Sequence, residues 1–386
     1  MISQTDQQAE SFVLLDPCRD YPAPRLPVLP QISCSGYGHG QLDSPLLQNG
    51  AIFVNAGRTA LQLIAQHLPT AGAFLLPSYH CPTMITPALS TGRKIRFYRI
   101  DEQLNADITD IAQHLRQGDV AAVLLPHYFG FPQTQITTIA ALAHASGAWL
   151  IEDCAHALFG NLDGKPLGSF GDYAIASTRK FFPGRDGGAL LINQGPAFPV
   201  DLPHYSLRDE MQAVYDLLQQ ASLAERRRTL TTGSTPTTAA APAPATPSPT
   251  RNSMHLRQGL RSSRWIWRNQ NSDQIASRRR QLFQRWLHHT LTLTGARPLF
   301  DTLPAHVVPY MFPLLLEQPA RDFAPLKRAG VPIWRWDELM PSGCANSQKY
   351  GLALLQLPCH QSLKEADVDW MAETLRRTLA STEETT

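Results

Sequence analysis

The segment Trp149-Leu-Ile-Glu-Asp-Cys-Ala-His156 is the strongest local indication of the fold. Three apolar residues run into two carboxylates, as is typical where a buried parallel strand reaches the carboxyl edge of an open α/β sheet. Ligands bind at that edge, so Asp153 can pair there with a cation carried by a ligand. Asp153 can equally cap a following helix, and from this segment alone both interpretations stay open.

Apolar segments of the same kind recur on both sides of it. They alternate with stretches of helical spacing, such as residues 59–68 and 138–146, and this alternation predicts an α/β fold with a mostly parallel sheet covered by helices. We assign the large domain to residues 46–228, and an N-terminal arm rich in Pro and Gly, residues 1–45, precedes it. The predicted strands lie at residues 51–54, 73–76, 94–98, 120–125, 149–151 and 188–192.

Composition changes abruptly after a last predicted helix at 205–228. Residues 229–250 are almost entirely Thr, Ala, Pro, Ser and Gly, and so few apolar anchors cannot offset the entropy of ordering. We therefore predict a flexible surface insertion, which with its basic flank covers residues 229–271. Trp265 and Trp267 in the flank could touch RNA or a membrane, but we favour docking of both on the core.

Residues 272–386 regain globular character and predict a smaller C-terminal α+β domain. Helical spacing recurs at 275–288, where basic residues are expected to form an outer face, and at 365–379. A strand is predicted at 307–316. Its prolines suggest an edge strand, because proline lacks the N–H donor that a central strand needs.

Bulk composition narrows the classes of partner. Hydrophobic residues make up 43% of the 386 residues, enough for a sizeable core. Lys and Arg number 34 against 32 Asp and Glu, a balance that gives no reason to expect nucleic acid or an anionic membrane. The six cysteines include no CxxC pair, so no metal site is expected. The N-terminus lacks the pattern of a secretory signal and no apolar stretch is long enough to span a membrane, so a cytoplasmic location is expected.

A second candidate segment, Ala174-Ile-Ala-Ser-Thr-Arg-Lys180, places a lysine directly after an apolar strand. A catalytic lysine needs partial burial, which lowers its pKa, and a nearby electrophile. Ser177 offers a hydroxyl to a phosphate, and Gly187 and Gly188 allow close approach of the backbone. Taken alone, Lys180 is more simply explained as an ordinary lysine on a surface loop.

A third candidate is the segment Asn55-Ala-Gly-Arg-Thr-Ala60, at the start of a predicted helix. Free backbone N–H groups and the helix dipole make such a start an anion site, and Gly57 would let a phosphate approach. The segment matches neither the dinucleotide-binding nor the P-loop pattern. Many helices begin with Gly and Thr, so the indication is weak by itself.

Three further residues follow predicted strands, and Asp186 precedes one. Tyr79 is the aromatic candidate to cover the ring of a cofactor, and Cys81 is a possible nucleophile without an identifiable partner. His127 could contact a substrate or satisfy a structural role, and we slightly favour the structural role. Asp186 is more simply a turn residue than an acid catalyst.

Taken in order, these segments resemble the DegT/DnrJ/EryC1/StrS sugar aminotransferases, a family with the aspartate-aminotransferase-like fold that uses pyridoxal 5′-phosphate (PLP). The resemblance runs from about residue 50 to the C-terminus and omits the insertion. Ser177 lies three residues before Lys180 instead of the family's five, and Phe181 replaces its asparagine, so the chain is a divergent member. The matching segments are Gly57-Arg-Thr-Ala-Leu61, Pro126-His-Tyr-Phe-Gly130, Ile151-Glu-Asp-Cys-Ala-His-Ala-Leu158, Gly168-Ser-Phe-Gly-Asp172 with Lys180 and Asp186-Gly-Gly188, and Leu357-Pro-Cys-His-Gln-Ser-Leu363.

The resemblance implies a PLP-dependent aminotransferase acting on small molecules. Lys180 would carry the cofactor and shuttle a proton, Asp153 would pair with the pyridine nitrogen, and His156 would lie near the ring. The implied amino donor is glutamate, the acceptor is a keto sugar linked to a nucleotide, and the usual assembly is a homodimer. The phosphate would be held by the backbone of Gly57, Arg58 and Thr59 and by the hydroxyl of Ser177.

Two other hypotheses stay open. A PLP enzyme of another reaction type, such as a lyase or a desulfurase, would use Cys81. A non-catalytic binding protein would keep the fold and bind a partner through residues 229–250 and their basic flank.

Overall fold

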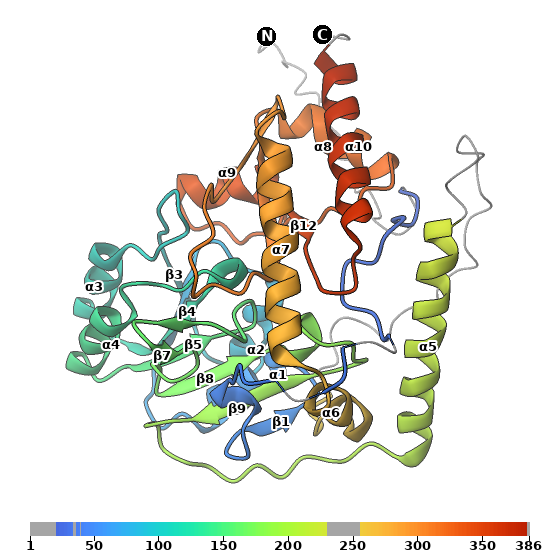
Figure 1. The fold of residues 1–386 in the computed structure, drawn as a ribbon. Helices are drawn as coiled ribbons and strands as arrows, with labels where there is room; N and C mark the ends of the chain where they lie inside the picture. Colours follow the sequence, from blue (N-terminus) through green and yellow to red (C-terminus); the bar gives the residue numbers. More distant parts are fainter. Residues whose placement is uncertain (1–20, 34–35, 39, 230–254, 384–386) are drawn as a thin grey trace, which may run out of the picture.

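A computed structural model of the chain describes residues 21–229 and 255–383, except for 34, 35 and 39. The large domain is built on a seven-stranded sheet (Figure 1). Four of its six neighbouring pairings are parallel, and β9 runs antiparallel to both of its neighbours, so the predicted mostly parallel sheet is confirmed. In spatial order the strands are β1 (Ile52–Val54), β9 (Gly188–Ile192), β8 (Tyr173–Ala176), β5 (Trp149–Asp153), β4 (Val120–Pro126), β2 (Ala73–Pro77) and β3 (Ile95–Tyr98).

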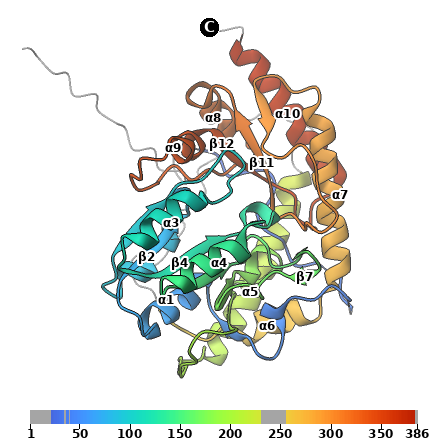
Figure 2. The same cartoon turned by 90° about the vertical axis from the view of Figure 1, so that its left-hand side faces the viewer.

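Helices cover both faces of this sheet because alternate strand residues point to opposite sides. On β2, Leu75 joins one buried cluster and Phe74 joins another. The first cluster contains apolar residues of α3 (Ile108–Arg116) and α4 (Ile136–Ala145). The second contains those of α1 (Gly57–His67) and α2 (Thr86–Leu89). Figure 2 shows α3 and α4 in front of the sheet. The helix α5 (Leu207–Thr229) comes after β9 in the chain and stands at the right of Figure 1.

The smaller C-terminal domain lies above the large domain in both views. Its sheet has the order β10-β11-β12. The domain has a buried cluster of its own, and Met311, Leu315 and Leu354 of its sheet join the first cluster of the large domain. The predicted α+β architecture is therefore correct. The elements are α7 (Ser272–Thr290), β10 (Ala296–Pro298), β11 (Met311–Leu316), α8 (Pro319–Arg328), α9 (Ala345–Ala353), β12 (Leu354–Pro358) and α10 (Glu365–Glu383).

The prediction of an edge strand at 307–316 is wrong, because β11 is the central strand of its sheet. Gln356, which lies opposite Pro313 on β12, exchanges its backbone hydrogen bonds with Trp334 on its other side. The backbone of Pro313 therefore faces the β10 side, where its carbonyl accepts the N–H of Leu299 at 3.0 Å. Leu299 is one residue past the end of β10, so the missing donor of Pro313 breaks no bond within the ladder.

The described part of the N-terminal arm packs on the small domain. The backbone N–H of Arg25 donates to Gly330 O at 3.1 Å, and His360 Nε2 lies 2.9 Å from Pro27 O. None of the helices in the described ranges is long and apolar enough to cross a membrane. The short elements are η1 (Pro45–Leu47), η2 (Pro82–Met84), η3 (Tyr128–Gly130), η4 (Thr178–Lys180), β6 (Asn161–Leu162) and β7 (Lys165–Pro166).

The region predicted as an insertion has two parts. Residues 230–254, which include nearly all of the low-complexity run, lie outside the described residues. Residues 255–271 are folded against the large domain, where Arg257 O accepts the N–H of Asn55 at 3.1 Å and α6 (Arg261–Arg268) follows. Trp267 is buried as expected, but Trp265 remains 61% exposed, so only one of the two tryptophans docks on the core.

Candidate active site

Asp153 and Lys180 meet at the carboxyl edge of two neighbouring strands. Asp153 is the last residue of β5 and pairs in register with Ile175 of β8. The short helix η4 begins two residues after β8 reaches Ala176 and ends at Lys180. Because both strands are parallel, the same edge of the sheet carries the carboxylate and the amine.

The carboxylate of Asp153 is buried and retains capacity for a cation. Its side chain is 5% exposed, and Oδ1 accepts the N–H of Ala155 at 2.8 Å. This bond is the local, capping type of contact that the sequence left open as an alternative. A carboxylate accepts several hydrogen bonds, so one N–H does not exhaust it. Burial raises the pKa of Asp153, and the bond from Ala155 and the charge of Lys180 counteract that rise.

Glu152, the neighbouring carboxylate, holds the backbone that leads into β8. Its Oε1 accepts Gly168 N–H at 2.6 Å, and its Oε2 accepts Phe170 N–H at 2.8 Å and Gly171 N–H at 3.0 Å. Burial acts to raise the pKa of Glu152, but hydrogen bonds from His127 and from these amides outweigh it and keep the pKa below its usual value. Glu152 therefore shapes the site without entering it.

His127 belongs to this structural layer. It is fully buried, its Nδ1 accepts Gln133 N–H at 3.0 Å, and its Nε2 lies 3.0 Å from Glu152 Oε1. With Cys154 it forms a cluster compact enough for a metal ion. An Nδ1 that accepts leaves the proton on Nε2, which donates to Glu152, so no imidazole lone pair remains for a metal. The structural role favoured for His127 agrees with this geometry.

The start of α1 is pressed against the end of β8. A β-carbon at Gly57 would lie 3.0 Å from Ala176 O and 3.9 Å from the β-carbon of Ser177, so only glycine fits comfortably. The half-buried Ser177 stands beside the first turn of the helix because of this contact, and the backbone N–H groups of that turn have no partner within the helix. This arrangement has the chemistry of a phosphate site.

Thr59 and Arg58, also expected at the phosphate, differ in whether their hydrogen-bond donors are free to bind it. The hydroxyl of Thr59 donates to Asn55 Oδ1 at 2.6 Å and its N–H donates to Ala56 O at 3.0 Å, so both of its donors are already engaged. Arg58 is exposed. The N–H groups of Gly57 and Arg58 are then the backbone donors that remain at this helix start.

An aromatic and imidazole cluster surrounds the amine of Lys180. Its Nζ lies 5.2 Å from the ring centroid of Tyr310, and the ring of His156 lies 4.5 Å from that of Tyr310. Burial and the positive charge of Lys180 hold the pKa of His156 well below its usual value, so this imidazole is neutral near pH 7. Burial also lowers the pKa of Lys180, while Cys81 and Asp153 act to raise it.

Tyr79 is not placed to cover a cofactor ring. It is fully buried, with its ring 4.9 Å from that of Trp336 and 5.7 Å from that of Tyr128. Cys81 is half-buried and near enough to Lys180 to affect its pKa. Of the two, Cys81 is therefore the residue of this turn that acts on the amine, while Tyr79 is enclosed among aromatic rings.

Sequence reasoning missed the contribution of the small domain. From sequence, Tyr310 lies between prolines in the predicted strand 307–316, and Arg279 is expected on the basic outer face of the helix at 275–288. Arg279 is instead 0% exposed, and its guanidinium donates to Lys180 O at 2.9 Å. No local pattern marks either residue, because each meets Lys180 only through the tertiary fold.

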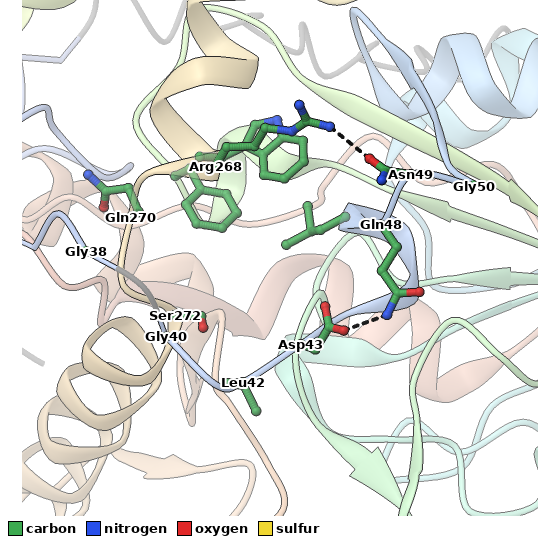
Figure 3. Close-up of a pocket in the computed structure, with 13 residues that line it drawn as sticks. Gly38, Gly40, Leu42, Asp43, Gln48, Asn49, Gly50, Arg268, Gln270 and Ser272 are labelled. Atoms are coloured by element: carbon green, nitrogen blue, oxygen red, sulfur yellow. Dashed lines mark hydrogen bonds between the residues drawn. The ribbon is translucent and has the colours of Figure 1, made fainter.

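A separate surface cavity of about 640 Å³ lies between the segment 38–50 and α6 (Figure 3). Phe182 and Trp267 are among its walls, and Arg268 donates to Asn49 Oδ1 at 3.2 Å within it. Asp153, His156 and Lys180 do not line this cavity. It is therefore distinct from the candidate active site.

Comparisons with known proteins find similarity over part of the chain. The model of the DegT/DnrJ/EryC1/StrS aminotransferase family matches residues 46–197. The serine hydroxymethyltransferase of Methanosphaera stadtmanae is 34% identical over 116 residues, which are 28% of this chain and 27% of that protein. The GDP-perosamine synthase of Vibrio cholerae is 27% identical over 151 residues, 37% of this chain and 40% of that protein. The chain thus matches less than half the length of either relative.

The fold has a counterpart among solved structures. The crystal structure of the aminotransferase TlmJ from Streptoalloteichus hindustanus superposes with a TM-score of 0.61 and 21% identity, and the superposition covers 86% of each chain. At this level of identity the likeness concerns the fold.

Proposed function

From the resemblance of residues 46–197 to the DegT/DnrJ/EryC1/StrS aminotransferase family, we propose that this protein is a PLP-dependent aminotransferase. The observation that carries the proposal is the juxtaposition of Asp153 and Lys180 at one sheet edge. Asp153 supplies a buried anion, and Lys180 supplies an amine whose pKa is lowered by burial. PLP requires these two groups, a partner for its pyridine nitrogen and an amine for its aldehyde.

The residues present fit this cofactor at both of its ends. The start of α1, where a β-carbon at Gly57 would press on Ala176 O, offers backbone N–H groups to a phosphate, with Ser177 beside it. At the other end, Asp153 has one described N–H donor, and its carboxylate can accept a further hydrogen bond from a cation. We assign the phosphate to Gly57, Arg58 and Ser177, and the ring nitrogen to Asp153. Thr59 and Tyr79 are left out because their side chains are engaged elsewhere.

The chemistry divides between the cofactor and the chain. Bound PLP supplies an electron sink that stabilises negative charge on the α-carbon of an amino donor. Asp153 keeps the pyridine nitrogen protonated. Nζ of Lys180 accepts the proton from that α-carbon and returns it, which requires an amine that is uncharged part of the time, and burial favours the uncharged form. His156, neutral and buried beside Tyr310, closes this side of the site to water.

The proposed substrates are glutamate as the amino donor and a keto sugar linked to a nucleotide as the acceptor. The matched GDP-perosamine synthase supports the sugar by its name, and the proposal places the reaction in surface polysaccharide or secondary-metabolite sugar biosynthesis. We further propose a cytoplasmic homodimer that acts on small molecules without a nucleic acid or membrane partner.

Absorbance spectroscopy tests this function. Purified protein mixed with PLP should develop a near-visible band, and glutamate should remove it while 2-oxoglutarate forms. Adding a keto sugar nucleotide should restore the band and yield an amino sugar. A band that glutamate leaves unchanged would contradict the aminotransferase assignment.

A second candidate is a PLP enzyme of another reaction type. Two observations favour it: Cys81 lies near Lys180, and the chain matches part of a serine hydroxymethyltransferase. Under this alternative Cys81→Ser abolishes turnover and glutamate does not alter the band. Under the aminotransferase proposal Cys81→Ser retains turnover.

A further inference from the structure

Arg279 is a buried cation whose described partners are neutral oxygen atoms. It lies on α7, which begins where Asn271 Oδ1 accepts the N–H of Gln274 at 3.0 Å. Its side chain is 0% exposed, and burial lowers its pKa to about 10, so it remains charged near neutral pH. Burying a charge without a carboxylate is costly, and full hydrogen bonding is the condition under which it is tolerated.

Arg279 and Gln361 together hold two consecutive carbonyls at Lys180. Nη2 of Arg279 donates to Lys180 O at 2.9 Å, and Nε2 of Gln361 donates to Phe181 O at 2.6 Å. The two side chains are joined, because Nε of Arg279 donates to Gln361 Oε1 at 3.0 Å. The guanidinium also lies over the ring of Phe181, 4.5 Å from its centroid.

The same guanidinium fixes the aromatic wall of the site. Its Nη1 donates to Pro309 O and to Tyr310 O, both at 3.1 Å. The ring of Tyr310 faces Lys180 Nζ at 5.2 Å. The planar guanidinium of Arg279 thus holds both the backbone of Lys180 and the backbone of Tyr310, whose ring packs against the amine. The flexible ammonium of a lysine at this position would not reproduce this rigid geometry.

We propose that Arg279, with Gln361, is a positioning unit that holds the amine of Lys180 at its working place in the site. The inference rests on the proposed function, since it gives the orientation of Lys180 a chemical purpose. Neither side chain touches the reacting atoms. They act through the backbone of Lys180 and Tyr310.

The chain offers a matched control for the test. Arg280 is the next residue of α7, and its Nη1 also donates to two backbone carbonyls, those of Pro304 and Val307. It has no described contact with the lysine loop. Arg280→Lys therefore removes the same kind of bonds at a comparable distance from the helix start.

The first measurement does not depend on PLP. The rate of acylation of Lys180 by an amine-reactive probe is followed across pH in the full-length protein and located by peptide mass spectrometry. Arg279→Lys is expected to change this rate and its pH midpoint, whereas Arg280→Lys leaves both as in wild type. Thermal unfolding of both variants is recorded in parallel, so that a general loss of stability is recognised.

The second measurement uses PLP. Formation of the near-visible band should slow by about 10–100-fold in Arg279→Lys, as expected for a small misplacement of a reacting group. Gln361→Asn shortens a half-buried side chain by one methylene, so this variant should fold. We expect it to slow formation of the band less than Arg279→Lys does. The double variant should be no slower than Arg279→Lys, because the two residues act as one unit.

The outcomes separate the two proposals. If wild type forms no band with PLP, the proposed function fails, while the acylation arm still decides the positioning role. If Arg279→Lys and Gln361→Asn acylate and react like wild type, the positioning role is overturned and these contacts serve stability.

Discussion

The carboxylate of Asp153 and the amine of Lys180 each favour the charged form of the other. The charge of Lys180 acts to lower the pKa of Asp153, and the charge of Asp153 acts to raise the pKa of Lys180. Burial opposes both effects and is the larger influence on each group. The net result is a raised pKa for Asp153 and a lowered pKa for Lys180, and perturbed pKa values of this kind are typical of groups that transfer protons.

Asp153→Asn should retain the fold and lose activity. The amide keeps an acceptor for Ala155 N–H but provides no negative charge for a protonated pyridine nitrogen. Loss of one preorganised electrostatic partner of this kind costs about 10²–10³-fold in turnover. Steady-state kinetics checks the prediction, and unchanged kcat in Asp153→Asn would refute the role of this carboxylate.

Glu152→Gln should destabilise the protein. Glu152 accepts three backbone N–H groups and pairs with buried His127, and breaking such a buried network costs about 3–5 kcal/mol. Because the folded pKa of Glu152 is lowered, its stabilisation is present above the unfolded pKa and is lost as pH falls through the folded pKa. Urea unfolding at several pH values measures both effects. The exposed Glu102→Gln is the control, and an equal, small loss in both variants would contradict the account.

Asp186→Asn should remove a pH dependence of stability. Burial raises the pKa of Asp186 to about 6, while its Oδ2 accepts Leu260 N–H at 3.0 Å, a bond that asparagine can keep. The folded protein binds this proton more tightly than the unfolded chain, so stability falls as pH rises from about 4 to 6. A shift of about two units corresponds to roughly 3 kcal/mol across that window. If wild type and variant show the same slope in denaturant titrations, Asp186 does not have the raised pKa.

Gly187→Ala should damage the lysine loop. Gly187 has φ +147, and a β-carbon there would collide with the side chain of Thr178, two residues before Lys180. Backbone strain of this kind costs about 1–3 kcal/mol, and the collision should also weaken PLP binding. Gly164→Ala is the control, since Gly164 has φ +78 but nothing within 4 Å of the added carbon. Equal PLP affinity in the two variants would count against close packing of this loop.

The sheet could be predicted from sequence because its signals are local. Each strand of the large domain is a short apolar run, and helical spacing separates most of them, so the runs at 73–76, 120–125 and 188–192 fall within β2, β4 and β9. Asp153 and Lys180 can be identified for the same reason, since Asp153 ends one strand and Lys180 comes four residues after the end of another. Parallel strands place such positions on one edge.

The errors concern residues whose surroundings come from distant parts of the chain. Arg279 resembles its basic neighbours on α7, and nothing local distinguishes an arginine that meets carbonyls of residues 180, 309 and 310 from a solvated one. Tyr79 and Cys81 share one turn, and only the packed aromatic cluster decides which of them is enclosed. Pro313 suggests an edge strand, yet its backbone faces Leu299, which lies beyond the end of β10, so the missing N–H breaks no bond of the ladder.

The central claim is that Lys180 carries the cofactor. PLP added to the purified protein is reduced with borohydride, and the modified lysine is located by peptide mass spectrometry in wild type, in Lys180→Ala and in the exposed-site control Lys165→Ala. The account predicts a near-visible band and a label on Lys180 in wild type and in the control, and neither in Lys180→Ala. A band and a stable label that persist in Lys180→Ala would contradict it.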